Sequence, residues 1–351
     1  MSGFDSIVDQ ERIVRRLSRI SRNEFIPHAL LFTGPEGVGK KQAAKVFAMA
    51  CNCLRGNKPV HAHRDGPHAS SSERESEALP CGMCRSCRKI AADVHPDIIF
   101  VQPQKATIRI SQIRDLCHIL AMKPYEAGQR VVIISDAHTM SPEAGNSLLK
   151  MLEEPPDKTL LILTAPHSQN LLPTIVSRCQ HFRFNPITHG TLMRLLTDDY
   201  GMQPKEADVL SRLANGSITK ARTLVETGWC QHRKWILDML IANEEARGPT
   251  GLNLLLAFSS RIAGSKSNLS DSLDTMKSWF RDLMIFPWAP DKVINKDRVD
   301  KIQALSQQMD SRLWVSHFDA VEKAQEMIAG NANPRLTMDV LMMHITGYSP
   351  S

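Results

Sequence analysis

The segment HALLFTGPEGVGK occupies residues 28–40 and joins a short apolar run to a glycine-rich turn. The Ala-rich run KQAAKVFAMACNC follows at 41–53, and this composition favours a helix. In a strand, glycine turn and helix of this order, backbone N–H groups and the helix N-terminus face phosphate oxygens. The segment therefore predicts an α/β fold built around a phosphate-binding loop (P-loop).

The turn matches only part of the P-loop pattern G-x-x-x-x-G-K-[ST]. Lys40 would reach the nucleotide phosphates, but Lys41 stands where a Ser or Thr supplies a hydroxyl to Mg²⁺. An ammonium group is a donor only and repels the metal. We expect weak nucleotide binding or none, with ATP or ADP held, if at all, by Gly34, Gly37, Gly39 and Lys40. The alternative is a loop that is kept only because it packs the fold.

A second catalytic position is also incomplete. The β-branched run VVIIS at 131–135 leads into Asp136-Ala137, where an ATPase of this type carries Asp-Glu. The Asp holds the Mg²⁺ shell, and the Glu orients the attacking water. Ala137 has no such group, and phosphoryl transfer depends on positioning and charge. We therefore expect no efficient ATP hydrolysis by this chain.

Apolar strands and amphipathic helices alternate through the first half of the chain. We expect strands at 97–102, 131–135 and 159–164, a helix capped by Ser111, and another opened by Ser141-Pro142. This alternation predicts a parallel sheet with helices on both faces. The helix near Ser111, with Arg114, is either a phosphate contact for DNA or an ordinary amphipathic helix.

The periodic segments after Pro186 are helical, with breaks at Gly248-Pro249 and at 287–296. Aromatic residues at helical spacing usually pack inward. We expect a core that includes Trp235, Trp279 and Trp314.

Arg178 lies where LPTIVSRC (172–179) ends a helix and enters a strand. An arginine at such a tip can reach the γ-phosphate held by a neighbouring subunit, as an arginine finger in trans. The alternative is a surface ion pair.

Cys81, Cys84 and Cys87 form a C-x₂-C-x₂-C cluster. This spacing suits one tetrahedral Zn²⁺, which needs a fourth ligand. We expect Cys53 to supply it; the alternatives are Cys51, His61, His63 and His68. An iron–sulfur cluster is a second possibility for the metal. A structural zinc would tie the polar, aperiodic segment 54–80, which we expect to be an exposed and mobile insertion, to the domain.

Composition and charge limit the class of protein. The formal net charge of +6 permits a polyanionic partner without requiring one. There is no run of 18 apolar residues for a membrane span and no apolar signal segment at the start. Clustered cysteines in such a chain indicate metal binding in a reducing, cytoplasmic compartment.

Several stretches together resemble a known family. They are HALLFTGPEGVGK, the cysteine cluster followed by HPDIIFV, ISQIRDL, RVVIISDAHTMSPEAGNSLLKMLEEPP, LLPTIVSRCQHFRF and, near the end, NANPRL. The chain is similar in these stretches to delta-prime subunits of bacterial DNA polymerase III, in the AAA+ clamp-loader family.

The resemblance implies three domains. They are a P-loop AAA+ domain at 1–187 with a zinc module around 53–87, a small helical lid at 188–230, and an all-α collar for oligomerisation at 231–351.

The resemblance also implies a role in DNA replication. The chain would be a stator that hydrolyses no ATP, in a hetero-pentameric ring with tau/gamma and delta subunits that loads the sliding clamp onto primed DNA. It would be one component of a DNA-directed DNA polymerase holoenzyme. Arg178 would be the finger for the adjacent tau/gamma subunit, and Cys53, Cys81, Cys84 and Cys87 the zinc ligands. Thr219 stands where active relatives carry a sensor arginine after Gly-Ser.

Two other functions remain open. One is a catalytically active, tau/gamma-like motor, which robust turnover by the isolated chain would indicate. The other is a stand-alone zinc-dependent DNA-binding protein, which would bind DNA tightly by itself and lose that binding on chelation.

Overall fold

The computed structural model describes residues 3–23, 25–55, 80–245, 257–264, 266–308 and 311–347. It divides into two compact units. Unit 1 comprises Met1–Leu192 and Asn215–Thr219, and unit 2 comprises Met193–Ala214 and Lys220–Ser351. The three-domain division remains a prediction. The expected mobile insertion at 54–80 lies, apart from its ends, outside the described residues, as does the predicted break at Gly248-Pro249.

Unit 1 is built on a parallel sheet, as predicted. Five strands lie in the order β2-β3-β4-β1-β5, and each neighbouring pair is parallel. The strands are β1 (Ala29–Thr33), β2 (Ile98–Val101), β3 (Arg130–Ile134), β4 (Thr159–Ala165) and β5 (Gln180–Arg183). The three central strands are buried along their whole length, which their continuous apolar runs explain.

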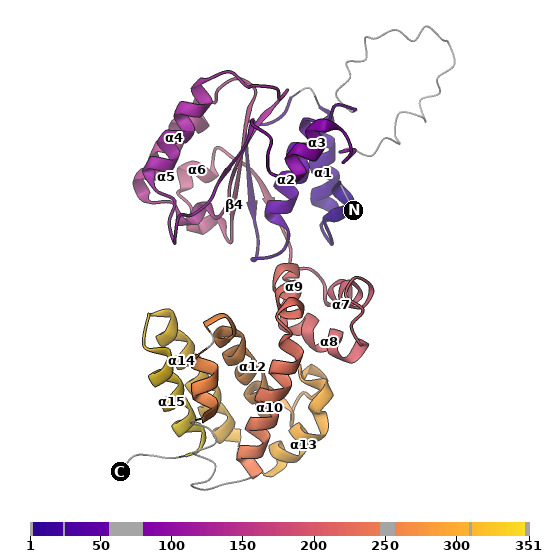
Figure 1. Ribbon diagram of the computed structural model, residues 1–351, viewed down its shortest axis with the longest axis vertical. Helices are drawn as coiled ribbons and strands as arrows, with labels where there is room; N and C mark the ends of the chain where they lie inside the picture. Colours follow the sequence, from indigo (N-terminus) through magenta and orange to yellow (C-terminus); the bar gives the residue numbers. More distant parts are fainter. Residues whose placement is uncertain are drawn as a thin grey trace, which may run out of the picture. The chain divides into compact units, whose positions relative to one another are not determined.

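Helices cover both faces of this sheet (Figure 1). On one face lie α1 (Glu11–Arg22), α2 (Lys40–Cys51) and α3 (Arg85–Ala91); on the other lie α4 (Ile110–Ala121), α5 (Pro142–Glu153) and α6 (Pro173–Val176). Alternate residues of each strand join different cores. Leu30 and Phe32 pack toward α1 and α2, whereas Leu31 packs toward α4 and α5.

Two helix N-caps were predicted from the sequence, at Ser111 and Ser141. Ser141 caps α5 as expected, because its hydroxyl accepts a hydrogen bond from the N–H of Ala144 at 3.2 Å. The prediction for Ser111 was wrong, since α4 begins at Ile110 and its N-cap is Arg109. There the Arg109 N–H donates to Gln112 Oε1 at 3.0 Å. This contact with the Gln112 side chain takes the place of a serine cap, and Ser111 lies in the first turn of α4.

The described part of unit 2 is helical, in line with the expectation for the chain beyond Pro186. Its helices are α7 (His189–Asp198), α8 (Pro204–Leu213), α9 (Ile218–Glu226), α10 (Trp229–Glu245), α12 (Lys266–Ile285), α13 (Val299–Gln308), α14 (Ser311–Ala329) and α15 (Pro334–Ile345). The first residues of α7 and α9 belong to unit 1. Trp279 and Trp314 lie fully inside this core, and the half-buried Trp235 packs against it.

The predicted break at 287–296 is an ordered connection between α12 and α13. Buried Asp282 of α12 accepts hydrogen bonds from the backbone N–H groups of Ile294 and Asn295. Arg233 of α10 donates to Asn295 Oδ1 at 2.7 Å and pairs with Asp297. These polar contacts join α10, α12 and the connection. In the described part of the chain, every helix is too short or too polar to cross a lipid bilayer.

Candidate functional site: the phosphate loop, the edge arginine and the cysteine cluster

The P-loop connects β1 to α2, as the sequence predicted. Gly34 has a φ of 146°, and a Cβ there would lie 2.5 Å from the carbonyl oxygen of Phe184. Gly39 has a left-handed φ of 93° and precedes the first residue of α2. Only glycine meets both conditions at low cost. The glycines of this loop are therefore explained by backbone geometry, whether or not the loop holds a phosphate.

Lys40 folds back onto its own loop. Its Nζ donates to the carbonyl oxygen of Gly34 at 2.5 Å and to that of Pro35 at 2.6 Å. Burial of the side chain lowers the pKa of Lys40, although the nearby carboxylates of Asp136 and Glu36 act in the opposite direction. Two of the three ammonium donors are thus used inside the loop, where a bound phosphate would otherwise receive them.

Residues 217–219 rest directly on the loop, within unit 1. The N–H of Ile218 donates to the carbonyl oxygen of Gly37 at 3.0 Å. A Cβ at Gly37 would lie 1.9 Å from the hydroxyl oxygen of Ser217 and 3.1 Å from the Cβ of Thr219. The segment that follows Gly216 and contains Thr219 therefore covers the loop at van der Waals distance.

The positions that would hold Mg²⁺ and water surround the same loop. Lys41 Nζ lies 5.9 Å from the centre of the Phe100 ring, so its ammonium contacts an aromatic face. Asp136 has a φ of 53°, and its N–H donates to Thr164 Oγ1 at 3.1 Å. Ala137 is buried in the core beside it. The arrangement offers one carboxylate, with no hydroxyl at position 41 and no carboxylate at position 137.

Arg178 lies at the edge of unit 1, between α6 and β5. Its Nη2 donates to Glu153 Oε1 at 2.7 Å and its Nη1 donates to the carbonyl oxygen of Thr174 at 3.0 Å. About a third of the Arg178 side chain and half of the Glu153 side chain are exposed, at 36% and 51%. The surface ion pair that the alternative interpretation expected is present, while the finger remains a prediction.

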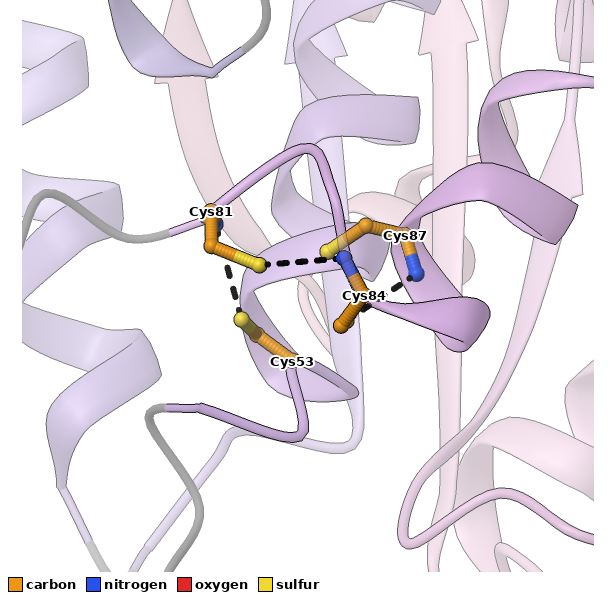
Figure 2. Close-up of side chains that lie close together, drawn as sticks. All are labelled: Cys53, Cys81, Cys84 and Cys87. Carbon is orange, nitrogen blue, oxygen red and sulfur yellow. Dashed lines mark hydrogen bonds between the residues drawn. The ribbon is translucent and has the colours of Figure 1, made fainter.

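Figure 2 shows four cysteines converging: Cys53 from just after α2, Cys81 and Cys84 from the segment before α3, and Cys87 from the first turn of α3. The sulfur atoms of Cys53, Cys81, Cys84 and Cys87 all lie within 4.8 Å of one another. Backbone N–H groups of Cys81, Cys84 and Cys87 donate to neighbouring sulfurs at 3.4 to 3.5 Å.

The donor set and its hydrogen bonds suit a metal. Four thiols at this separation match the tetrahedral sulfur coordination of Zn²⁺, and N–H···S bonds favour the thiolate form that binds it. Burial alone would raise the pKa of Cys81, but hydrogen bonds from Cys84 and Met83 outweigh it and lower that pKa to about 7. Burial raises the pKa of Cys87 instead.

The structure separates the candidates for the fourth ligand. Cys53 belongs to the cluster, whereas Cys51 lies outside it, and burial raises the pKa of Cys51 to about 12. The other candidates, His61, His63 and His68, lie outside the described residues.

Two contacts at these sites were missed by reasoning from sequence. Glu153 was not identified as the partner of Arg178, and Ser217 was not identified as a cover of the loop. Each joins residues far apart in the chain, so no short motif marks the pair. Ser111 and Arg114 are both exposed on α4, so the predicted DNA contact there stays a prediction.

The sequence of this chain matches a known protein family. Residues 9–188 match the family model described as DNA polymerase III, delta subunit. The chain is 27% identical to the DNA polymerase III subunit delta' of Bacillus subtilis, over 95% of each chain. It is 32% identical to the delta' subunit of Pseudomonas aeruginosa, over 60% of each chain.

Other relatives carry a different name. The DNA polymerase III subunit tau of Bacillus subtilis is 28% identical over 97% of this chain, which spans 61% of that protein. A DNA polymerase III gamma-subunit-related protein from Thermotoga maritima aligns with 97% of this chain at 17% identity and a TM-score of 0.43.

Proposed function

The chain belongs to the DNA polymerase III delta subunit family and is a delta-prime-like clamp-loader subunit, and from this we propose that it acts as a stator that hydrolyses no ATP. In this role it is a fixed member of a ring with tau/gamma and delta subunits. The ring places a sliding clamp on primed DNA, and this chain supplies an arginine to the ATP site of its neighbour.

The proposal rests on one observation, the hydrogen bonds between Lys40 and the backbone of its own loop. A phosphate-binding lysine whose ammonium donates to two carbonyl oxygens of its own loop must break both bonds before it binds a nucleotide. Burial of the ammonium raises the cost of breaking these two hydrogen bonds, because little water is at hand to replace them. The ammonium of Lys40 thus has hydrogen-bond acceptors without a bound nucleotide.

The surrounding positions support the same conclusion. Residues 217–219 would have to move away from Gly37 to admit phosphates. Even then, position 41 has no hydroxyl for Mg²⁺, and Ala137 cannot orient a water. Because each defect affects a different part of phosphoryl transfer, repair of any single position leaves the reaction without a needed group.

Arg178 is the group that this chain gives to its neighbour. An arginine finger must be charged, partly exposed and held at the edge of its domain, and Arg178 meets these conditions. Its present partner, Glu153, is itself half-exposed, and such pairs contribute only about 0–1 kcal/mol to stability. Exchange of Glu153 for a phosphate oxygen is therefore energetically accessible.

Zn²⁺ bound by Cys53, Cys81, Cys84 and Cys87 is structural in this proposal. All four tetrahedral positions are filled by the chain, so none is left for a substrate. The metal would fasten the end of α2 to the start of α3 across the intervening segment. Beyond this module, we keep the lid at 188–230 and the collar at 231–351 as proposed functional parts.

The relatives named tau favour a second candidate, an active motor subunit. The two candidates make opposite predictions for the isolated chain. A motor hydrolyses ATP alone, whereas a stator hydrolyses none and only supports hydrolysis by its neighbour.

Reconstitution tests the proposal. Purified tau/gamma and delta subunits are mixed with this chain, and assembly is followed by size-exclusion chromatography. The expected result is a single complex whose DNA-dependent ATP hydrolysis requires this chain. Failure to enter such a complex would contradict the proposed role.

A further inference from the structure

The solvent-facing side of α1 carries a continuous row of arginines. The helix reads ERIVRRLSRISR, and its arginines are Arg12, Arg15, Arg16, Arg19 and Arg22. They recur every three or four residues, which places them along one side of a helix. All five are exposed. We call this surface the arginine row.

The positive charge of the row is not neutralised by the rest of the described structure. Across the described residues, none of the five arginines forms an ion pair. Arg16 lies over the Phe182 ring at 4.5 Å, which fixes its position without removing its charge. Glu11, one turn before Arg15, is the single acidic residue of the helix. The helix side chains therefore leave a net charge of about four on this surface.

The opposite side of α1 is already used. Ile13, Leu17 and Ile20 are buried in the core of unit 1. A basic amphipathic helix binds a membrane through its apolar face, and here that face is not available. The row itself contains no apolar side chain, whereas a protein interface usually has an apolar centre. These facts favour a partner recognised through regularly spaced negative charge alone.

We propose that the arginine row of α1 is a docking surface for the phosphodiester backbone of a nucleic acid. From Arg12 to Arg22 the helix rises by about 15 Å, at about 1.5 Å per residue. That length covers about four successive phosphates of one strand, at about 3.4 Å of axis each. Guanidinium groups bind phosphate oxygens in a bidentate geometry, and backbone contacts of this kind carry no sequence preference.

This inference is independent of the stator role, because none of the five arginines is used in the argument on the P-loop or on Arg178. It also differs from the contact considered at α4, since α1 and α4 cover opposite faces of the sheet (Figure 1). A failure of the ATP experiments would leave it standing, and its own failure would not affect them.

The test uses the full chain with the substitutions Arg15→Gln and Arg19→Gln together. Glutamine keeps helix propensity and removes charge, and Arg16 is left in place because it packs on Phe182. The matched control is Lys123→Gln with Lys158→Gln, which removes the same charge from exposed residues elsewhere in unit 1. Thermal unfolding of each variant checks that the fold is retained.

Binding of a short fluorescent duplex, and of its single strand, is measured by anisotropy at several salt concentrations. For the duplex, we expect the row variant to reduce the slope of log K against log salt by about 2 relative to the parent. For the single strand the reduction is about 1.4. The control variant keeps the parent slope. The form of nucleic acid that the parent binds more tightly at the same salt concentration is the preferred form.

Three results would overturn the proposal. The first is no binding by the parent even at low salt. The second is an unchanged slope in the row variant, or an equal change in the control. The third is tighter binding of poly-glutamate than of either DNA form at equal charge concentration, with that tighter binding lost in the row variant. This last result would assign the surface to an acidic protein.

Discussion

The carboxylate of Glu153 holds the guanidinium of Arg178, with Oε1 and Nη2 2.7 Å apart at the edge of unit 1. The carbonyl oxygen of Thr174 fixes the other terminal nitrogen at 3.0 Å. A flexible side chain is thus held in one orientation by two acceptors from different helices, α5 and α6. An arginine ordered in this way loses less conformational freedom when it binds a new oxyanion.

Replacement of Arg178 by Ala tests its proposed role. We expect the ring to assemble, with hydrolysis at the adjacent site slowed by about 10³-fold or more, because a finger neutralises charge in the transition state. The stability of the isolated chain should change by no more than about 1 kcal/mol. Single-turnover ATP hydrolysis by the reconstituted ring, with primed DNA, measures the effect.

Glu153→Gln is the matched control, since it removes the ion pair and keeps Arg178. It should leave most of the ring's hydrolysis in place. Equal loss in both variants would point to the ion pair, and unchanged hydrolysis in Arg178→Ala would remove the finger assignment.

The cysteine cluster predicts about one zinc per chain, because four ligands fill one tetrahedral ion. Cys84→Ser should abolish this content, and Cys53→Ser should do the same. Cys51→Ala should keep the metal, because Cys51 lies outside the cluster. Elemental analysis of the purified variants measures each case. Zinc retained in Cys53→Ser but lost in Cys51→Ala would reverse the assignment of the fourth ligand.

His317 predicts a pH-dependent stability for unit 2. Its ring is buried against Phe280 and Trp314, and burial, with His344 nearby, lowers its pKa to about 4. In the unfolded chain the pKa is about 6.5. Between these values the unfolded state binds more protons, so stability falls as the pH falls. The loss should reach about 3 kcal/mol by pH 4.

Denaturant unfolding at several pH values measures this slope. His317→Leu should remove the part of this slope that His317 contributes, although the variant starts from a different stability. The same replacement at the exposed His118 should keep the parent slope. A slope that is unchanged in His317→Leu would show that other groups are responsible for it.

The sheet could be predicted from sequence because its signals are local and redundant. The strand starting near Val131 reads as a continuous β-branched run, and Ser141 caps α5 with the expected geometry. The cap of α4 was predicted wrongly because Gln112, a residue with no strong cap preference, satisfies the N–H of Arg109. The side chain of Gln112 reaches back three residues and takes the place of the usual short capping side chain.

The site was predictable in its residue types and less so in its contacts. The spacing of the cysteines marked the cluster, and only the fold distinguished Cys53 from its neighbour Cys51. The sequence showed that position 41 lacks a hydroxyl. It did not show that Lys40 bonds to its own loop or that residue 217 lies against Gly37, because both depend on how the chain closes on itself.

The most direct test of the central claim is ATP turnover by the purified chain alone, with Mg²⁺ in excess. We predict no turnover above background, and none in Ala137→Glu, because Lys41 still stands at the metal position. The same preparation should increase hydrolysis when it is added to its partner subunits, which shows that the protein is folded and competent. Brisk, Mg²⁺-dependent turnover by the chain without partners would contradict the account.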